Sequence, residues 1–141
     1  MEYSKLSDAD INGLVMDALS DGNQVHRCDK GSAIKLLHQV NTVEFGEHIE
    51  REEVYAKFDP CNNPADAWPI ISANRISVEY DSEHQCDVPA EWVTAYGIDD
   101  LKVYVVAHQP CDKALRSAMI VFLMMQESAN VPANSTGSDL R

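Results

Sequence analysis

The segment from Leu101 to His108 places the strongest constraint on how this chain can fold. If this segment is an extended strand, both of its faces are apolar. One face carries Leu101, Val103, Val105 and Ala107, and the other carries Tyr104 and Val106. A strand buried on both faces needs cover above and below the sheet. The sequence therefore predicts an α+β fold, a mostly antiparallel sheet covered by helices on both faces (an α-β-α sandwich), with this strand at its centre.

Helical signals stand at both ends of the chain. Apolar side chains recur in residues 6–22 at the spacing of one helical face, and Ser7 and Asp10 have the spacing of a capping box. A second helix is predicted from Lys113 to Ser128, with Asp112 as its cap. This helix is apolar on almost every side, which is typical of a core element. We expect the two helices to cover the same face of the sheet.

A short central helix is predicted to cover the opposite face. Asn63 is a favoured N-cap, and Pro64 follows at the first helical position, where its missing N–H does no harm. Pro69 removes one internal hydrogen bond and keeps the helix short. Asn74 is predicted to end the helix in the left-handed conformation.

Three strands are predicted after the central helix. Ile76 to Tyr80 alternates apolar and polar side chains, and Trp92 to Tyr96 has the composition of a strand. A polar loop from Asp81 to Ala90 separates these two strands. Gly97 to Asp100 is predicted as a turn that leads into the strand from Leu101 to His108.

The residues before the central helix leave two alternatives open. Val25 to Cys28 is predicted as a short strand. Ser32 to Val40 fits a short helix, whereas Ile34 to Phe45 fits an extended segment equally well. The acid-rich run from Glu44 to Glu53 is interpreted as a solvent-exposed face. We expect one or two strands in this part of the chain.

Length and charge restrict the function classes. The 141 residues suit one domain, so we expect a single globular α+β domain over residues 1–128 and a disordered polar tail over residues 129–141. The net charge of −12 argues against direct binding to nucleic acid and to anionic membranes. The longest apolar run is far shorter than the roughly 20 residues that span a bilayer, and we expect no signal peptide. The protein is therefore expected in the cytoplasm, with its cysteines reduced.

Short spacings pair imidazole with thiol at three places: His26 with Cys28, His84 with Cys86, and His108 with Cys111. Residues two apart on a strand point the same way, so such a pair could chelate zinc. Because the sequence lacks a Cys-x-x-Cys spacing, we expect neither a metal site nor another cofactor.

The sequence also contains no motif that is typical of a catalytic nucleophile. The sequence has no glycine-rich phosphate loop, serine elbow or His-Glu-x-x-His, so we assign no catalytic residue and do not expect an enzyme. Cys61 is the best candidate for a reactive thiol, because a helix N-terminus follows it and lowers a thiol pKa. The interpretation we favour for Cys61 is a small packing residue in a tight turn.

Five residues form the predicted ligand-binding site: Asn62, Asn63, Trp68, Arg75 and Arg116. The amides stand at the head of the central helix, where backbone N–H groups also collect. An aromatic surface and a few scarce cations would suit a nucleotide-like ligand by stacking and charge pairing. The alternative interpretation is that the tryptophan belongs to the core and Asn63 only caps the helix.

Three blocks of sequence carry a resemblance to a known family. The first is Met1-Glu-Tyr-Ser-Lys-Leu-Ser-Asp-Ala-Asp-Ile-Asn. The second is Asp59-Pro-Cys-Asn-Asn-Pro-Ala-Asp-Ala-Trp-Pro-Ile-Ile, followed by Asn74-Arg-Ile-Ser. The third is Leu115-Arg-Ser-Ala-Met-Ile-Val-Phe-Leu-Met-Met-Gln-Glu. Together they resemble the NinX-like family of small accessory proteins from lambdoid phages, and more loosely the phage alpha-beta-alpha sandwich domains. The family tends to have Asn-Pro-Leu-Arg before the last helix, where this chain has Cys111-Asp-Lys-Ala before Leu115.

The resemblance implies a phage or prophage origin and expression in the cytoplasm of an infected bacterium, but it brings no biochemical activity. Our first hypothesis is a non-enzymatic accessory protein that acts by binding, in its sharpest form as a sponge that sequesters a small nucleotide signal of host defence. The second is a phage protein that binds and antagonises a host protein, and the third is a small enzyme of an unrecognised type. The sequence leaves the oligomeric state open.

Overall fold

The computed structural model describes residues 1–83 and 90–130 of the chain. In these residues it has three α-helices, six β-strands and two short 3-10 helices, Tyr3–Lys5 and Cys111–Lys113. The order along the chain is α1 (Asp8–Ser20), β1 (Val25–Cys28), β2 (Ile34–Glu44), β3 (Glu47–Phe58), α2 (Pro64–Ala73), β4 (Ser77–Glu83), β5 (Ala90–Asp99), β6 (Lys102–Gln109) and α3 (Ala114–Ala129). Most of the predicted tail, residues 131–141, and part of the predicted loop, residues 84–89, lie outside the described residues.

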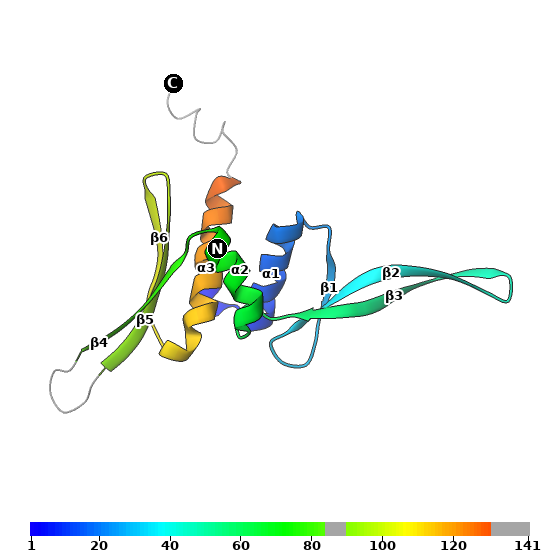
Figure 1. Ribbon diagram of the computed structural model, residues 1–141, viewed down its shortest axis with the longest axis horizontal. Helices are drawn as coiled ribbons and strands as arrows, with labels where there is room; N and C mark the ends of the chain where they lie inside the picture. The colour runs from blue at the N-terminus through cyan, green and yellow to red at the C-terminus, as the bar shows by residue number, and fades with distance from the viewer. Residues whose placement is uncertain (84–89, 131–141) are drawn as a thin grey trace, which may run out of the picture.

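The helices form a layer between two separate antiparallel sheets (Figure 1). One sheet has the strand order β4-β5-β6 and packs against α3, and the other has the order β1-β2-β3 and meets α1 at the base of β2. The helices α1 and α2 both pack on α3. The largest fully buried apolar side chains come from all three layers: Ile11, Val15, Ile34, Val93, Met119 and Val121. The α+β class is confirmed.

The predicted single sheet with a central strand at Leu101 to His108 is wrong. Residues 102–108 of that segment lie in β6, which is an edge strand and, among the residues that the structure describes, pairs with β5 alone. The helices lie on one side of this sheet, so Tyr104 and Val106 pack on the core while Val103 and Val105 remain 58% and 45% exposed. The apolar pattern on both faces therefore marks an edge strand with one uncovered face.

The predicted N-cap of α1 is confirmed, and that of α3 is not. Ser7 caps α1 as predicted: its hydroxyl accepts from the Asp10 amide at 3.1 Å, and the Asp10 carboxylate accepts in return from the Ser7 amide. The core position of α3 is also confirmed, since most of its residues are buried. The predicted cap at Asp112 is wrong, because Asp112 lies in a preceding 3-10 turn and Lys113 takes the cap position without a side-chain bond.

The central helix α2 starts as predicted and ends differently. The Asn63 side chain accepts from the Ala65 amide at 3.0 Å, and Pro64 occupies the first turn. At the other end Asn74 has a φ of −102°, whereas Arg75 takes the left-handed conformation with a φ of +54°. The prediction that Asn74 would be the left-handed residue is therefore wrong by one position.

Gly97 lies inside β5 and not in the predicted turn. A Cβ atom at this position would lie 2.7 Å from Met125 Sδ and 3.2 Å from Val121 Cγ1 of α3. Gly97 thus leaves room for the Met125 and Val121 side chains of α3 to pack directly on the sheet backbone. The actual turn between β5 and β6 follows Asp99, with Asp100 at a φ of +54°.

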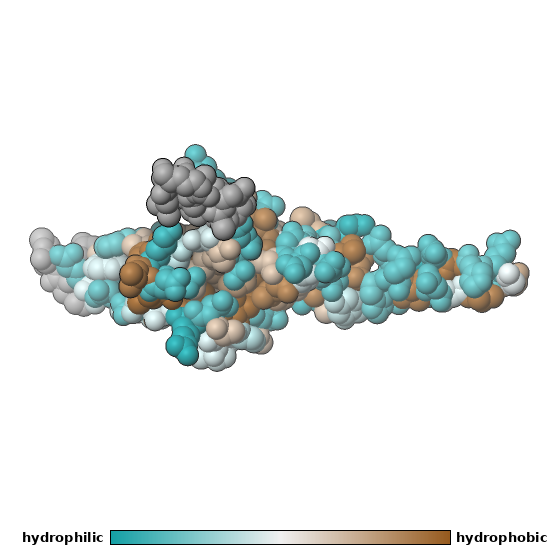
Figure 2. Space-filling view, turned by 90° about the horizontal axis from the view of Figure 1, so that it is seen from above, coloured by the Kyte–Doolittle hydropathy of each residue, from teal (hydrophilic) through white to brown (hydrophobic). Residues whose placement is uncertain are grey.

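The strands β2 and β3 form a two-stranded arm that projects from the helical body (Figure 1). Of the two alternatives, the extended one is confirmed for Ile34 to Phe45. Register runs from Ile34 opposite Phe58 at the base to Glu44 opposite Glu47 at the tip, with an irregularity between Leu36 and Leu37. Beyond the base, the arm is covered mainly by hydrophilic residues (Figure 2), in agreement with the predicted exposed acidic face.

Candidate functional site

The turn that precedes α2 is held by a buried amide from α1. Asn12 is fully buried, and its Nδ2 donates to the Ser32 carbonyl at 2.9 Å and to Asp59 Oδ1 at 2.8 Å. Its Oδ1 accepts from the Cys61 amide at 3.1 Å. Both ends of the side chain are therefore satisfied, as a buried polar group requires.

Asp59 completes this connection. Its carboxylate also accepts from the Ser32 hydroxyl and from Asn62, and its amide donates to Asp66 of α2 at 2.9 Å. One carboxylate and one amide thus join α1, the segment before β2 and the start of α2. The unusual residues of this stretch have a structural role.

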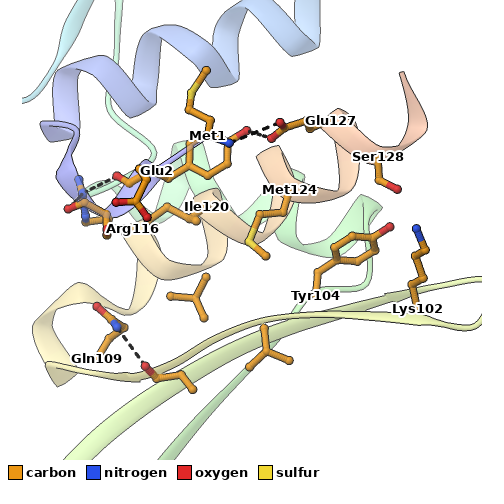
Figure 3. Close-up of a pocket in the computed structure, with 15 residues that line it drawn as sticks. Met1, Glu2, Lys102, Tyr104, Gln109, Arg116, Ile120, Met124, Glu127 and Ser128 are labelled. Atoms are coloured by element: carbon orange, nitrogen blue, oxygen red, sulfur yellow. Dashed lines mark hydrogen bonds and ion pairs between the residues drawn. The ribbon is translucent and has the colours of Figure 1, made fainter. Parts of the chain in front are cut away.

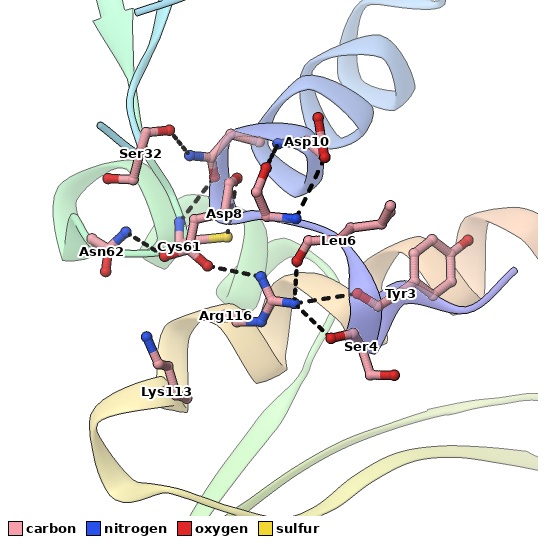
Figure 4. A network of polar contacts seen from close by, with 12 residues as sticks. Tyr3, Ser4, Leu6, Asp8, Asp10, Ser32, Cys61, Asn62, Lys113 and Arg116 are labelled. Atoms are coloured by element: carbon pink, nitrogen blue, oxygen red, sulfur yellow. Dashed lines mark hydrogen bonds and ion pairs between the residues drawn. The ribbon is translucent and has the colours of Figure 1, made fainter. Parts of the chain in front are cut away.

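A second polar cluster joins the N-terminal segment to α3 (Figure 4). Arg116 donates to Asp8 Oδ1 at 2.8 Å and to the backbone carbonyls of Tyr3, Ser4 and Leu6 at 3.2, 3.4 and 2.6 Å. Burial alone would raise the pKa of the Asp8 carboxyl, but hydrogen bonds from Asn62 and Arg116 together outweigh it and lower that pKa. The guanidinium is committed to protein partners on several sides.

Of the five predicted ligand-binding residues, the fold brings Arg116 to the adjacent pair Asn62 and Asn63, whereas Trp68 and Arg75 lie apart from them. Asn62 and Arg116 contact the two oxygens of the same carboxylate, Asp8, with the Asn62 bond at 3.0 Å. Asn63 is used as the helix cap. Trp68 is 66% exposed on α2, and Arg75 is exposed beyond the other end of that helix. Ligand binding by these residues stays a prediction.

Cys61 is not a reactive thiol in this fold. The side chain is 2% exposed, and burial raises its pKa to about 12, with the charge of Asp8 adding to the effect. The expected lowering of its pKa by the helix N-terminus is wrong, because desolvation of the thiolate dominates. The favoured interpretation, a packing residue in a tight turn, agrees with this burial.

Within residues 1–83 and 90–130, no group of three or more His, Cys, Asp or Glu side chains is placed to hold a metal ion. His26 instead pairs with Asp17 at 2.9 Å, and the pair of His84 and Cys86 lies outside the described residues. Among the described helices, none is long and apolar enough to cross a membrane.

The tip of the arm holds the residues that the sequence analysis missed. Phe45 and Gly46 connect β2 to β3 with φ values of +52° and +80°, the signs of a type I′ turn. Such turns favour Asn and Gly, yet Phe45 is fully exposed at 104%. Glu44 and Glu47 stand directly opposite each other beside it. The sequence signal for this turn was Glu-Phe-Gly-Glu, placed between two segments that fit extended strands.

Like charges in direct opposition destabilise a strand pair, and a positive φ is unfavourable for a residue with a Cβ atom. Neither cost at the tip is offset by burial of the phenyl ring. Local backbone strain of this kind is concentrated at functional positions in proteins. We therefore take the arm tip as the candidate interaction site.

Comparison with known proteins identifies the family. A family model described as bacteriophage P22, NinX matches residues 2–126, and this match overlaps all three blocks that carried the resemblance. No curated protein and no solved structure matches the chain. Because the family model covers most of the sequence, the chain belongs to the family of bacteriophage P22 NinX.

Proposed function

We propose that this phage protein acts as an accessory factor in the cytoplasm of the infected bacterium, by docking its arm onto a host protein. The observation that carries the proposal is Phe45, an aromatic side chain held in water at a position with positive φ. A solvent-exposed aromatic ring is a typical anchor of a protein interface, where it fills a pocket on the partner. The function is binding and not turnover.

The charges around Phe45 indicate the chemistry of the partner surface. Glu44, Glu47 and Glu50 lie within five residues of the ring, and Arg51 is the basic residue paired with Glu44, at 4.0 Å. Acidic groups around an apolar anchor favour a partner with a pocket surrounded by lysine and arginine side chains. This arrangement favours a host-protein antagonist over a nucleotide sponge.

The nucleotide hypothesis keeps one supporting observation, which is the exposed ring of Trp68. A phosphate group would also need a free cation beside that ring. Arg116 is bound to Asp8 and to backbone carbonyls, and Arg75 lies past the C-terminal end of α2. Denaturing protein purified from infected cells and identifying released small molecules by mass spectrometry tests this alternative. A stoichiometric nucleotide whose retention falls in Trp68→Ala would support it.

Photo-crosslinking in infected cells tests the arm. The crosslinker p-benzoylphenylalanine in place of Phe45 is expected to capture one host protein, whereas the same crosslinker in place of Leu101, an equally exposed residue of the turn between β5 and β6, does not. The purified host protein should then bind the wild-type chain, and Phe45→Ser should raise the dissociation constant at least about tenfold. Equal capture from both positions, or unchanged affinity of Phe45→Ser, would refute the docking role of the arm.

A further inference from the structure

The edge strands of the two sheets differ in how they are protected against pairing with another chain. The four edges in the described residues are β1, β3, β4 and β6. The first has only four residues, and β3 and β4 carry several glutamate or aspartate side chains. Short length and charge are devices that block edge-to-edge association. The eight residues of β6 contain no acidic side chain, although the whole chain has a net charge of −12.

The free edge of β6 is apolar on both faces. On the side of α3, a cavity of about 650 Å³ runs beside the strand, with Tyr104, Ile120 and Met124 in its wall (Figure 3). On the other side, Val103 and Val105 are exposed. A strand added to this edge would therefore place apolar side chains against protein on either face while its backbone paired with that of β6.

We propose that the occupant of this edge is β6 of a second copy of the chain, paired antiparallel about a two-fold axis at Val105. The residues of β6 select the partner: apart from Lys102 at its start the strand carries no lysine, arginine or acidic side chain, so a second β6 places uncharged side chains against Val103 and Val105, whereas β3 or β4 would place several carboxylates there. A two-fold axis makes the contact self-complementary. This inference is independent of the arm and of its proposed function.

The register follows from the alternation and the length of the strand. Opposed residues in an antiparallel pair share a face, so the two-fold axis must pass a residue, and an axis at Val105 pairs the whole stretch from Lys102 to His108. Val105 then lies opposite its own copy, Val103 lies opposite Ala107, and Tyr104 lies opposite Val106. The last is a favourable aromatic and β-branched pair. His108, with a φ of +55°, ends the regular strand and sets the limit of the pairing.

Sedimentation equilibrium of the full chain tests the proposal at about 1 to 100 µM, a range that brackets micromolar dissociation constants. The wild type is expected to shift from one to two chain masses with concentration. Val105→Lys and Val105→Glu each place two like charges face to face at the axis, and each should remain a monomer. An equimolar mixture of the two variants should form a heterodimer, because the opposed charges are then opposite in sign.

Folding and surface controls accompany these variants. Val105 is exposed, so both substitutions should leave the unfolding midpoint near that of the wild type. Val43→Lys adds the same charge at a 64% exposed position of the arm and should leave the dimer intact. A monomeric wild type over the whole range, or a dimer that persists in both Val105 variants, would overturn the proposal. Failure of the mixture to associate would overturn the register.

Discussion

Arg116 and Arg75 are both scarce cations, but they stand in different environments. Replacing Arg116 by Ala would leave Asp8 without its ion pair and the Leu6 carbonyl without its 2.6 Å donor. We expect Arg116→Ala to lower the free energy of unfolding by about 2–4 kcal/mol, measured by urea denaturation. The Arg75 side chain makes no hydrogen bond or ion pair within the described part of the chain. Arg75→Ala should therefore change the free energy of unfolding by less than about 0.5 kcal/mol. A loss of unfolding free energy in Arg116→Ala as small as that in Arg75→Ala would show that Arg116 is not a structural residue.

The lowered pKa of Asp8 predicts a pH dependence. A carboxyl whose pKa is lower in the folded state contributes stability that is fully present above its unfolded pKa, near 3.9, and is lost as the pH falls through the folded value. Asp8→Asn should therefore be less stable than the wild type at pH 7. The difference should narrow below about pH 4, because Asp8 of the unfolded chain then becomes protonated while folded Asp8, with its lower pKa, keeps its charge to lower pH. Urea denaturation of both proteins from pH 7 to pH 3 measures it, and a constant difference would contradict the prediction.

At the scale of elements, the contact between α3 and β5 depends on Gly97. An added methyl group would meet Met125 Sδ at 2.7 Å and Val121 Cγ1 at 3.2 Å, so the Met125 side chain must move and Val121 must give way slightly. We expect Gly97→Ala to destabilise the protein by about 1–3 kcal/mol, the usual cost of overpacking a core. Met125→Ala makes room at the same place, and the double variant should lose less than the sum of the two single losses. If the losses of stability measured by thermal or urea unfolding are additive in the double variant, the contact between position 97 and Met125 is not the cause of the destabilisation.

The starts of α1 and α2 could be read from the sequence because their side-chain caps depend on neighbours within four positions, whereas α3 starts without a side-chain cap. Ser7 with Asp10, and Asn63 with Pro64, were predicted correctly for this reason. The position of β6 could not be read in the same way. An apolar pattern reports that side chains avoid water in some arrangement, and it does not say whether helices lie on one face of the sheet or on both.

The candidate sites show the same limit. Asp8 and Arg116 meet across 108 positions of sequence, so their pairing depends on the packing of α1 against α3. Sequence alone presented Arg116 as a scarce cation suited to ligand binding. Phe45 was overlooked for a related reason, because an aromatic residue in an uncertain segment reads as part of a strand until the turn is known.

For the whole molecule, the arrangement of sheet, helices and sheet separates a stable body from an arm that adds little to the core. Below the irregularity at Leu36, buried residues such as Ile34 and Phe58 anchor the arm to the helices. Above it, no residue of either strand is buried. Isolated two-stranded ribbons are marginally stable in water. The outer arm should therefore be retained for its interactions and not for its contribution to folding.

This separation predicts the result of removing the outer arm. Residues 39–52 can be replaced by Asn-Gly, because His38 and Glu53 are opposed and a two-residue turn can join them. The shortened protein should unfold cooperatively, with a free energy of unfolding within about 1 kcal/mol of the wild type, since the buried base is kept. In a direct binding measurement the shortened protein should not bind the host protein that crosslinks to position 45 of the full chain, and it should still form the dimer through β6. A body that no longer folds would show that the outer strands support the core, and retained binding would place the docking surface elsewhere.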